Sequence, residues 1–179
     1  MRVISGSRRG RKLIEFDGDY IRPTTDRVKE SMFNLIQSEI PGSVVYDAFA
    51  GSGALGIEAL SRGAEFVFCT DIDERSVDVI TRNYNDCSFG DKVRIHKKKA
   101  VDFLQDTDAE FDVIFMDPPY NKGLVTPALK VIHDRQLLSD DGIIVIERDG
   151  EEDSFETNSF QVLKERKYGR TIITVLTKR

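Results

Sequence analysis

The sequence predicts an α/β fold in which a doubly wound, mostly parallel sheet carries helices on both faces. Short apolar runs typical of buried strands alternate with segments of helical periodicity along most of the chain. A glycine-rich loop directly follows the first of these runs, at the position where such folds bind ligands. The last two apolar runs have no helix between them, which predicts an antiparallel hairpin at the end of the sheet.

An N-terminal arm and a helix precede the alternating region. Residues 1–22 predict a short β-hairpin or an irregular arm, with Gly6 and Gly10 as turn residues. Pro23 and residues 24–26 predict the start of a helix, because threonine hydroxyls cap free backbone N–H groups and an aspartate suits the helix dipole. Val28, Met32, Leu35 and Ile36 then follow at helical spacing, and the Pro-Gly pair at residues 41–42 is predicted to end the helix.

Strand-like and helix-like segments alternate from residue 44 onward. The predicted strands cover residues 44–46, 65–70, 93–95, 111–116, 143–146, 160–163 and 171–176. The predicted helices cover residues 54–61, 74–85, 101–105 and 124–133. Strands separated by helices of this length form βαβ units, whereas the turn at Tyr168-Gly169 joins the last two strands directly.

The composition is that of a soluble, single-domain protein. The chain has 179 residues, of which 40% are hydrophobic and 32% charged, and we treat residues 1–179 as one domain. Within it we distinguish an arm and helix (residues 1–40) from a catalytic core (residues 43–179). No apolar run approaches the roughly 20 residues of a membrane span, and the first residues lack the apolar segment of a signal peptide. With only Cys69 and Cys87 a disulfide framework is excluded, so we expect a cytoplasmic protein.

Positive charge is concentrated near the N-terminus of this acidic chain. The net charge is -5, but residues 1–30 contain eight Lys or Arg against five Asp or Glu. A local basic face can bind phosphate on a protein that is acidic overall. A solubilising terminus explains the same charges, and a second basic cluster closes the chain. The candidate residues for binding the phosphates of a nucleic acid are Arg2, Arg8, Arg9, Arg11, Arg22 and Arg27.

The glycine-rich loop that follows the first predicted strand is the first candidate site. It contains Asp47, Phe49, Gly51 and Gly53 in the pattern Asp-x-Phe-x-Gly-x-Gly. The glycines let the backbone approach a ligand closely where a strand gives way to a helix. An acid at the strand end would repel the pyrophosphate of NAD but suits the ammonium group of an amino-acid ligand. The loop therefore favours S-adenosylmethionine over NAD.

A second acid ends the next predicted strand. Asp71 lies 20 residues after Gly51, where a carboxylate can accept hydrogen bonds from both hydroxyls of a ribose. Ile72 beside it can cover one face of an adenine. The alternative is that Asp71 or Asp73 only caps the following helix. We assign the contact with the ribose to Asp71 and the capping of the following helix to Asp73.

The sequence Asp117-Pro118-Pro119-Tyr120 follows the predicted strand at residues 111–116. Consecutive prolines cannot continue a central strand, so the chain leaves the sheet at its carboxyl edge, where ligands bind in such folds. Asp117 and the carbonyl group of Pro118 can then present two acceptors to one NH₂ group. An ordinary turn is the alternative, which the two acids at earlier strand ends disfavour.

That pair of acceptors suits methylation of an amino group on a nucleic-acid base. The lone pair of such an amine is delocalised into the ring and is a poor nucleophile. Two acceptors that hold its hydrogens orient the amine and favour the pyramidal form that attacks a methyl group. Tyr120 would stack on a base withdrawn from its helix. We therefore expect Asp117, Pro118, Pro119 and Tyr120 to form the catalytic motif.

Several longer segments match one family of enzymes. The most specific are N-terminal: RVISG at residues 2–6, GRKL at residues 10–13, RPTTDRVKE at residues 22–30 and FN at residues 33–34. Residues 47–60 and 117–120 match the cofactor and catalytic motifs of the same family. Over nearly its whole length the chain resembles the bacterial 16S ribosomal RNA guanine-N2 methyltransferases of the RsmD type.

The resemblance implies a Rossmann-like methyltransferase sheet and S-adenosyl-L-methionine as the cofactor. It implies methyl transfer to the N2 amine of a guanine in 16S ribosomal RNA, and we expect the partner to be RNA within a small-subunit assembly particle. The tetrapeptide at residues 117–120 is shared with adenine-N6 enzymes, so the N-terminal segments make the ribosomal assignment. Related enzymes usually place Asp or Asn after the third strand to contact the adenine. This chain has Lys99-Ala100 there, so the backbone of Ala100, or Asp102, would serve instead.

Three other functions compete with this interpretation. An adenine-N6 DNA methyltransferase would use the same chemistry, but we find no separate target-recognition domain in the sequence. A catalytically silent, RNA-binding assembly factor would not need the intact acids at positions 47, 71 and 117. An NAD-dependent oxidoreductase is disfavoured by Asp47. We expect no metal, because His96 and His133 lie apart from each other and from the cysteines.

Overall fold

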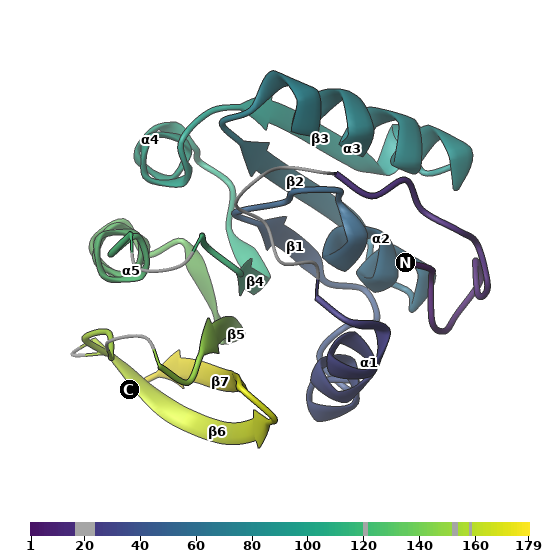
Figure 1. The fold of residues 1–179 in the computed structure, drawn as a ribbon. Coiled ribbons are helices and arrows are strands. Elements are labelled where there is room, and N and C mark those ends of the chain that lie inside the picture. The colour runs from purple at the N-terminus through teal and green to yellow at the C-terminus, as the bar shows by residue number, and fades with distance from the viewer. Residues whose placement is uncertain (17–23, 120–121, 152–153, 158) are drawn as a thin grey trace.

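The computed structural model describes residues 1–16, 24–119, 122–151, 154–157 and 159–179. Its strands form one sheet in the order β3-β2-β1-β4-β5-β7-β6 (Figure 1). The neighbouring strands β3, β2, β1, β4 and β5 run parallel, whereas β7 is antiparallel to both β5 and β6. The predicted doubly wound sheet with a C-terminal antiparallel hairpin is therefore confirmed. The strands are β1 (Val44–Asp47), β2 (Phe66–Asp71), β3 (Val93–Lys97), β4 (Phe111–Met116), β5 (Leu138–Asp149), β6 (Phe160–Tyr168) and β7 (Thr171–Lys178).

Helices cover both faces of the sheet and bury two apolar clusters. One face is covered by α1 (Asp26–Leu35), α2 (Ala54–Ser61) and α3 (Glu74–Asp86). The other is covered by α4 (Ala100–Asp106) and α5 (Val125–Asp134). A short 3₁₀ helix, η1 (Gly90–Lys92), leads into β3. The predicted end of the first helix at the Pro-Gly pair of residues 41–42 is wrong, because α1 ends at Leu35 and Ile36 leaves helical geometry with a φ of -125°. None of the helices in the described residues is long and apolar enough to cross a bilayer.

Two strands, β5 and β6, extend by five residues or more beyond one of their predicted ends, because those ends consist mostly of polar residues. The prediction for β5 covers only its apolar centre, residues 143–146, whereas the strand starts five residues earlier and includes exposed polar residues. The edge strand β6 continues to Tyr168 through mostly exposed charged residues. Charged residues on an edge strand discourage pairing with other chains, but they hide the apolar alternation that predicts a strand.

The N-terminal arm forms the predicted hairpin over its described part. Arg2 and Lys12 pair in an antiparallel bridge, and the Val3 N–H donates to the Arg11 carbonyl oxygen at 2.9 Å. Gly6 and Gly10 adopt φ values of +86° and +84°, so both turn positions favour glycine. The hairpin therefore brings its arginines into one ordered structure.

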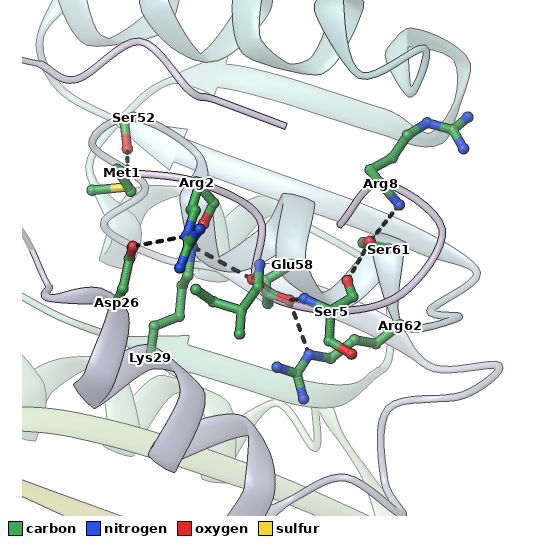
Figure 2. A network of polar contacts seen from close by, with 11 residues as sticks. Met1, Arg2, Ser5, Arg8, Asp26, Lys29, Ser52, Glu58, Ser61 and Arg62 are labelled. Carbon is green, nitrogen blue, oxygen red and sulfur yellow. Dashed lines mark hydrogen bonds and ion pairs between the residues drawn. The ribbon is translucent and has the colours of Figure 1, made fainter. Parts of the chain in front are cut away.

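A buried ion network attaches this arm to the body of the protein (Figure 2). At its centre the Glu58 carboxylate of α2 is fully buried and accepts hydrogen bonds from the backbone N–H groups of Ile4 and Ser5, at 2.8 and 3.1 Å. The Arg62 Nε donates to it at 2.9 Å, and the Lys29 Nζ of α1 lies 3.5 Å away. Burial lowers the pKa of Lys29, and the negative charge of Glu58 opposes that shift. The arm, α1 and α2 are thus joined through one carboxylate.

Candidate active site

Three acids lie at the carboxyl ends of neighbouring strands. Asp47 ends β1, Asp71 ends β2, and Asp117 follows the last residue of β4. Strand β1 lies between β2 and β4, and the register places Asp47 opposite Cys69 on one side and Phe115 on the other. The strand order reverses between β1 and β4, and ligands of open α/β sheets bind in the crevice at that point. The fold therefore brings these three predicted residues to one edge.

The loop between β1 and α2 depends on two glycines. Gly51 and Gly53 have φ values of +60° and +83°, which other residues rarely adopt. A Cβ atom at Gly53 would lie 2.9 Å from the Tyr84 ring, whereas one at Gly51 would meet no atom of the described residues within 4 Å. The loop thus packs tightly on α3 at Gly53 and leaves space beside Gly51. Phe49 is half-buried against the cluster that α4 and α5 cover.

Asp47 is a buried carboxylate that the described residues leave without a hydrogen-bond partner. Its side chain is almost fully enclosed, and neither carboxylate oxygen accepts a hydrogen bond from them. Burial raises the pKa of Asp47 to about 7; the backbone amide of Gly56 opposes the shift, and the charge of Asp71 adds to it. A positively charged ligand group nearby would offset the cost of burying this charge.

Asp71 is held by the loops on either side of it. Its Oδ2 accepts from the Gly51 N–H and its Oδ1 from the Asp73 N–H, each at 2.9 Å. Burial raises the pKa of Asp71, and these backbone hydrogen bonds oppose the shift. Each carboxylate oxygen has a further lone pair for a ligand hydroxyl. The cap of α3 is Asp73, which accepts from the Arg75 N–H at 2.9 Å, as predicted.

The residues assigned to the adenine differ in exposure. The Ile72 side chain is 67% exposed, so it can cover a flat ring. Ala100 is buried at the start of α4, and Lys99 precedes it as the N-cap residue without a side-chain hydrogen bond to the helix. Asp102 is exposed in the first turn of the same helix. The backbone of Ala100 and the side chain of Asp102 therefore both remain candidates for the adenine contact.

The catalytic motif contacts two residues that the sequence does not single out as site residues. The Thr24 hydroxyl lies 3.1 Å from Asp117 Oδ2 and 2.9 Å from Glu147 Oε2. The sequence predicts a capping role for both threonines, but only Thr25 caps α1, by accepting from the Val28 N–H at 3.3 Å. Glu147 lies just outside the predicted strand, although an acid that directly follows an apolar strand is the same signal that marks Asp117. Tyr120 lies outside the described residues.

A cavity of about 390 Å³ lies beside the motif, on the side of α5. Pro118, Pro119, Arg148 and Phe155 are among its lining residues. The Arg148 Nε is buried and has no hydrogen-bond partner among the described residues. The two prolines therefore form part of a cavity wall, so the motif can be approached from that side.

Two of the candidate RNA-binding arginines are engaged within the protein. The Arg8 Nε donates to the Cys87 carbonyl oxygen at 2.7 Å, and its guanidinium lies over the Phe89 ring at 4.8 Å. The Arg2 Nε lies 3.5 Å from Asp26, but the Arg2 side chain is 65% exposed. Arg8 thus helps to fix the arm on the end of α3, whereas Arg2 remains accessible.

Three other arginines of the set are exposed. Arg9 and Arg11 lie on the arm and Arg27 lies on the first turn of α1. Within the part of the chain that the structure describes, none of these three forms an ion pair. Arg22 lies outside the described residues. Among the candidate arginines in the described part of the arm, Arg9 and Arg11 therefore combine an exposed side chain with the absence of an ion pair.

Known proteins match this chain in sequence and in fold. The family model described as Conserved hypothetical protein 95 matches residues 1–177. Ribosomal RNA small subunit methyltransferase D of Haemophilus influenzae is 34% identical over 173 residues, which cover 94% of this chain and 89% of that protein. The enzyme of the same name from Escherichia coli K12 is 36% identical over 151 residues, which cover 84% and 76%. The chain belongs to this family.

The solved structures agree with this assignment. The yhhF protein of Escherichia coli, described as a methyltransferase, superimposes with a TM-score of 0.88 at 29% identity, over 100% of this chain and 98% of that one. The predicted membership of the RsmD type and the predicted Rossmann-like methyltransferase fold are both confirmed. The chain is a methyltransferase.

Proposed function

We propose that this chain transfers the methyl group of S-adenosylmethionine to N2 of a guanine in 16S ribosomal RNA of the small subunit. The observation that carries the proposal is the buried Asp47, which has no partner among the described residues, near the open side of Gly51 and next to the strand that presents Asp117. A cationic amino-acid group fits that carboxylate, whereas a phosphate does not. The family members named above are small-subunit ribosomal RNA methyltransferases, which supports the substrate.

Four features of the crevice would hold the cofactor. Asp47 balances the charge of its amino-acid part, and the loop at Gly51 and Gly53 lets the backbone approach it. Asp71 accepts from the ribose hydroxyls, and Ile72 covers the adenine. When bound, the cofactor supplies a methyl group activated by its sulfonium.

Asp117 and the Pro118 carbonyl group hold and orient the target amine. Both are acceptors at the end of β4, so they can take the two hydrogens of one NH₂ group. This favours the pyramidal amine and aligns it for attack, which is a gain in orientation and electrostatics. Asp117 does not need to remove a proton beforehand, because methylation makes the nitrogen strongly acidic. The proton then passes to Asp117 or to water.

The N-terminal arm would bind the RNA. Arg9 and Arg11 are exposed there, and the planar guanidinium matches phosphate geometry. A small arm and one pocket offer little surface for reading a long sequence, so a partly assembled small subunit that exposes the guanine is the expected substrate. Tyr120 would serve as the stacking platform for that base.

The experiment gives labelled S-adenosylmethionine and purified enzyme to naked 16S RNA, to assembled small subunits and to DNA in parallel. We expect label as N2-methylguanine in small-subunit RNA. Asp117→Ala should lower turnover by at least about 100-fold, and leave cofactor affinity near wild type. Asp117→Asn should keep part of the activity, and the exposed Asp141→Ala serves as the matched control. Label chiefly as N6-methyladenine in DNA would overturn the proposal, and so would normal turnover in Asp117→Ala.

A further inference from the structure

A second carboxylate stands beside Asp117 at the catalytic edge of the sheet. The Thr24 hydroxyl lies within hydrogen-bond distance of both Asp117 Oδ2 and Glu147 Oε2, and both contacts are partly buried. A hydroxyl carries one hydrogen, so it donates to only one of the two carboxylates at a time. Each carboxylate has two oxygens that accept hydrogen bonds, so the pair can also receive donors from a ligand.

The sheet explains why these two carboxylates meet. Strands β4 and β5 are parallel neighbours, and Met116 lies opposite Ile146 in their register. Asp117 directly follows β4, and Glu147 is the corresponding residue of β5, so the two residues stand level where β4 ends. Phe115 and Val145, two residues earlier, both belong to the apolar cluster on the side of α1. Since strand residues alternate between faces, Glu147 projects toward α1, where Thr24 meets it.

Two adjacent carboxylates match one edge of guanine. Beside its N2 amine, guanine carries an N1–H group, so donors point outward from two neighbouring nitrogens. Beside their exocyclic amines, adenine and cytosine carry a ring nitrogen with a lone pair. A carboxylate placed next to the one that holds the amine therefore attracts guanine and repels the other two bases.

We propose that Glu147 accepts the N1–H of the target guanine and thereby selects guanine over adenine and cytosine. Thr24 acts as a positioning residue, because its hydroxyl lies between the two carboxylates and donates to one of them at a time. This inference rests on the proposed function, because it takes the amine held by Asp117 to be N2 of guanine. Other amino methyltransferases share the catalytic motif, so the motif alone does not select the base. In this proposal Glu147 makes that selection.

The test replaces the methylated guanine with 2-aminopurine in RNA assembled into small subunits. That base keeps the amine but has a lone pair at N1. Wild type should prefer guanine by at least about 100-fold in kcat/KM, because the Glu147 carboxylate faces that lone pair. In Glu147→Gln the side-chain amide can donate to N1, so the preference should fall by at least about tenfold. Glu110→Gln, an exposed residue before β4, should keep the wild-type preference.

The Thr24 variants provide a second readout. Thr24→Val should also reduce the preference for guanine, whereas Thr24→Ser should retain it because the hydroxyl remains. If Glu147→Gln does not fold, the comparison of these two variants decides. An unchanged guanine preference in Glu147→Gln or in Thr24→Val, with active wild type, overturns this inference alone. If wild type methylates no guanine, the proposed function and this inference fall together.

Discussion

Replacing Asp47 with asparagine should remove a pH-dependent loss of stability from the free protein and weaken cofactor binding. The folded state raises the pKa of Asp47 from 3.8 to about 7, mainly by burial. Between these two values the folded protein binds more protons than the unfolded chain, so its stability falls as pH rises through this window. Above the folded pKa the buried carboxylate is charged, and the cost stays constant. The asparagine side chain carries no charge, so the variant does not follow this pH dependence.

The size of the effect follows from the same two pKa values. A carboxyl group with a pKa near 7 instead of 3.8 costs the folded state about 4 kcal/mol once it is ionised. At pH 5 only part of that cost is present. The stability of Asp47→Asn relative to wild type should therefore improve by about 2–3 kcal/mol between pH 5 and pH 8. An unpaired amide in the same place has its own burial cost, but that cost is the same at both pH values.

Urea unfolding without cofactor at pH 5 and pH 8 measures this difference. The control is the variant Asp78→Asn, which changes an exposed residue of α3. The stability of this variant relative to wild type should be the same at both pH values. Calorimetry with S-adenosylmethionine should show weaker binding for Asp47→Asn, because the variant no longer balances a cationic group. Parallel pH profiles for wild type and Asp47→Asn would refute the reasoning, since they would show that the buried carboxyl group is not what titrates.

Three further predictions follow from other contacts. Glu58→Ala should lower the free energy of unfolding in urea by about 3–5 kcal/mol, because a buried lysine and two backbone N–H groups of the arm lose their partner. The control Glu65→Ala, at an exposed position, should change the free energy of unfolding by less than about 0.5 kcal/mol. Asp71→Ala should weaken S-adenosylmethionine binding by at least about tenfold in calorimetry, since each charged hydrogen bond to the ribose contributes roughly 1.5–3 kcal/mol, and unchanged affinity would remove its ribose role. Replacing both Arg9 and Arg11 with alanine should reduce the salt dependence of RNA binding by a slope of about 2, and an unchanged slope would place the RNA elsewhere.

Local patterns predict most of the fold. Apolar periodicity distinguishes strands from helices, and the absence of a helix between the last two runs predicts the hairpin that β6 and β7 form. The ends of β5 and β6 escape prediction because hydrogen bonding to a neighbouring strand extends them through polar residues, such as Asp140 and Lys167, that lack apolar alternation. Pairing between distant segments, rather than local preference, fixes those ends.

The sequence likewise predicts some residues of the candidate site and misses others. Asp47, Asp71 and Asp117 are identifiable because each follows an apolar run directly, and parallel strands gather such positions at one edge. Glu147 and Thr24 are 123 residues apart, and their contact depends on how the chain enters α1. No local pattern in the sequence indicates such a contact. The engagement of Arg8 with Phe89 likewise depends on where the arm lies.

The attachment of the arm by Glu58 has a consequence for the thermodynamics of RNA recognition. Because Ile4 and Ser5 already donate to a buried carboxylate, the described part of the arm, residues 1–16, is held on the body of the protein before any RNA binds. A disordered basic tail would lose conformational entropy on binding and would fold around its target. This arm avoids that loss, so the complex should form as a docking of two rigid surfaces with a small change in heat capacity. On the proposal that the arm binds RNA within a small-subunit particle, the same attachment would restrict it to RNA whose phosphates already match its shape, so the conformation of that particle would contribute to recognition.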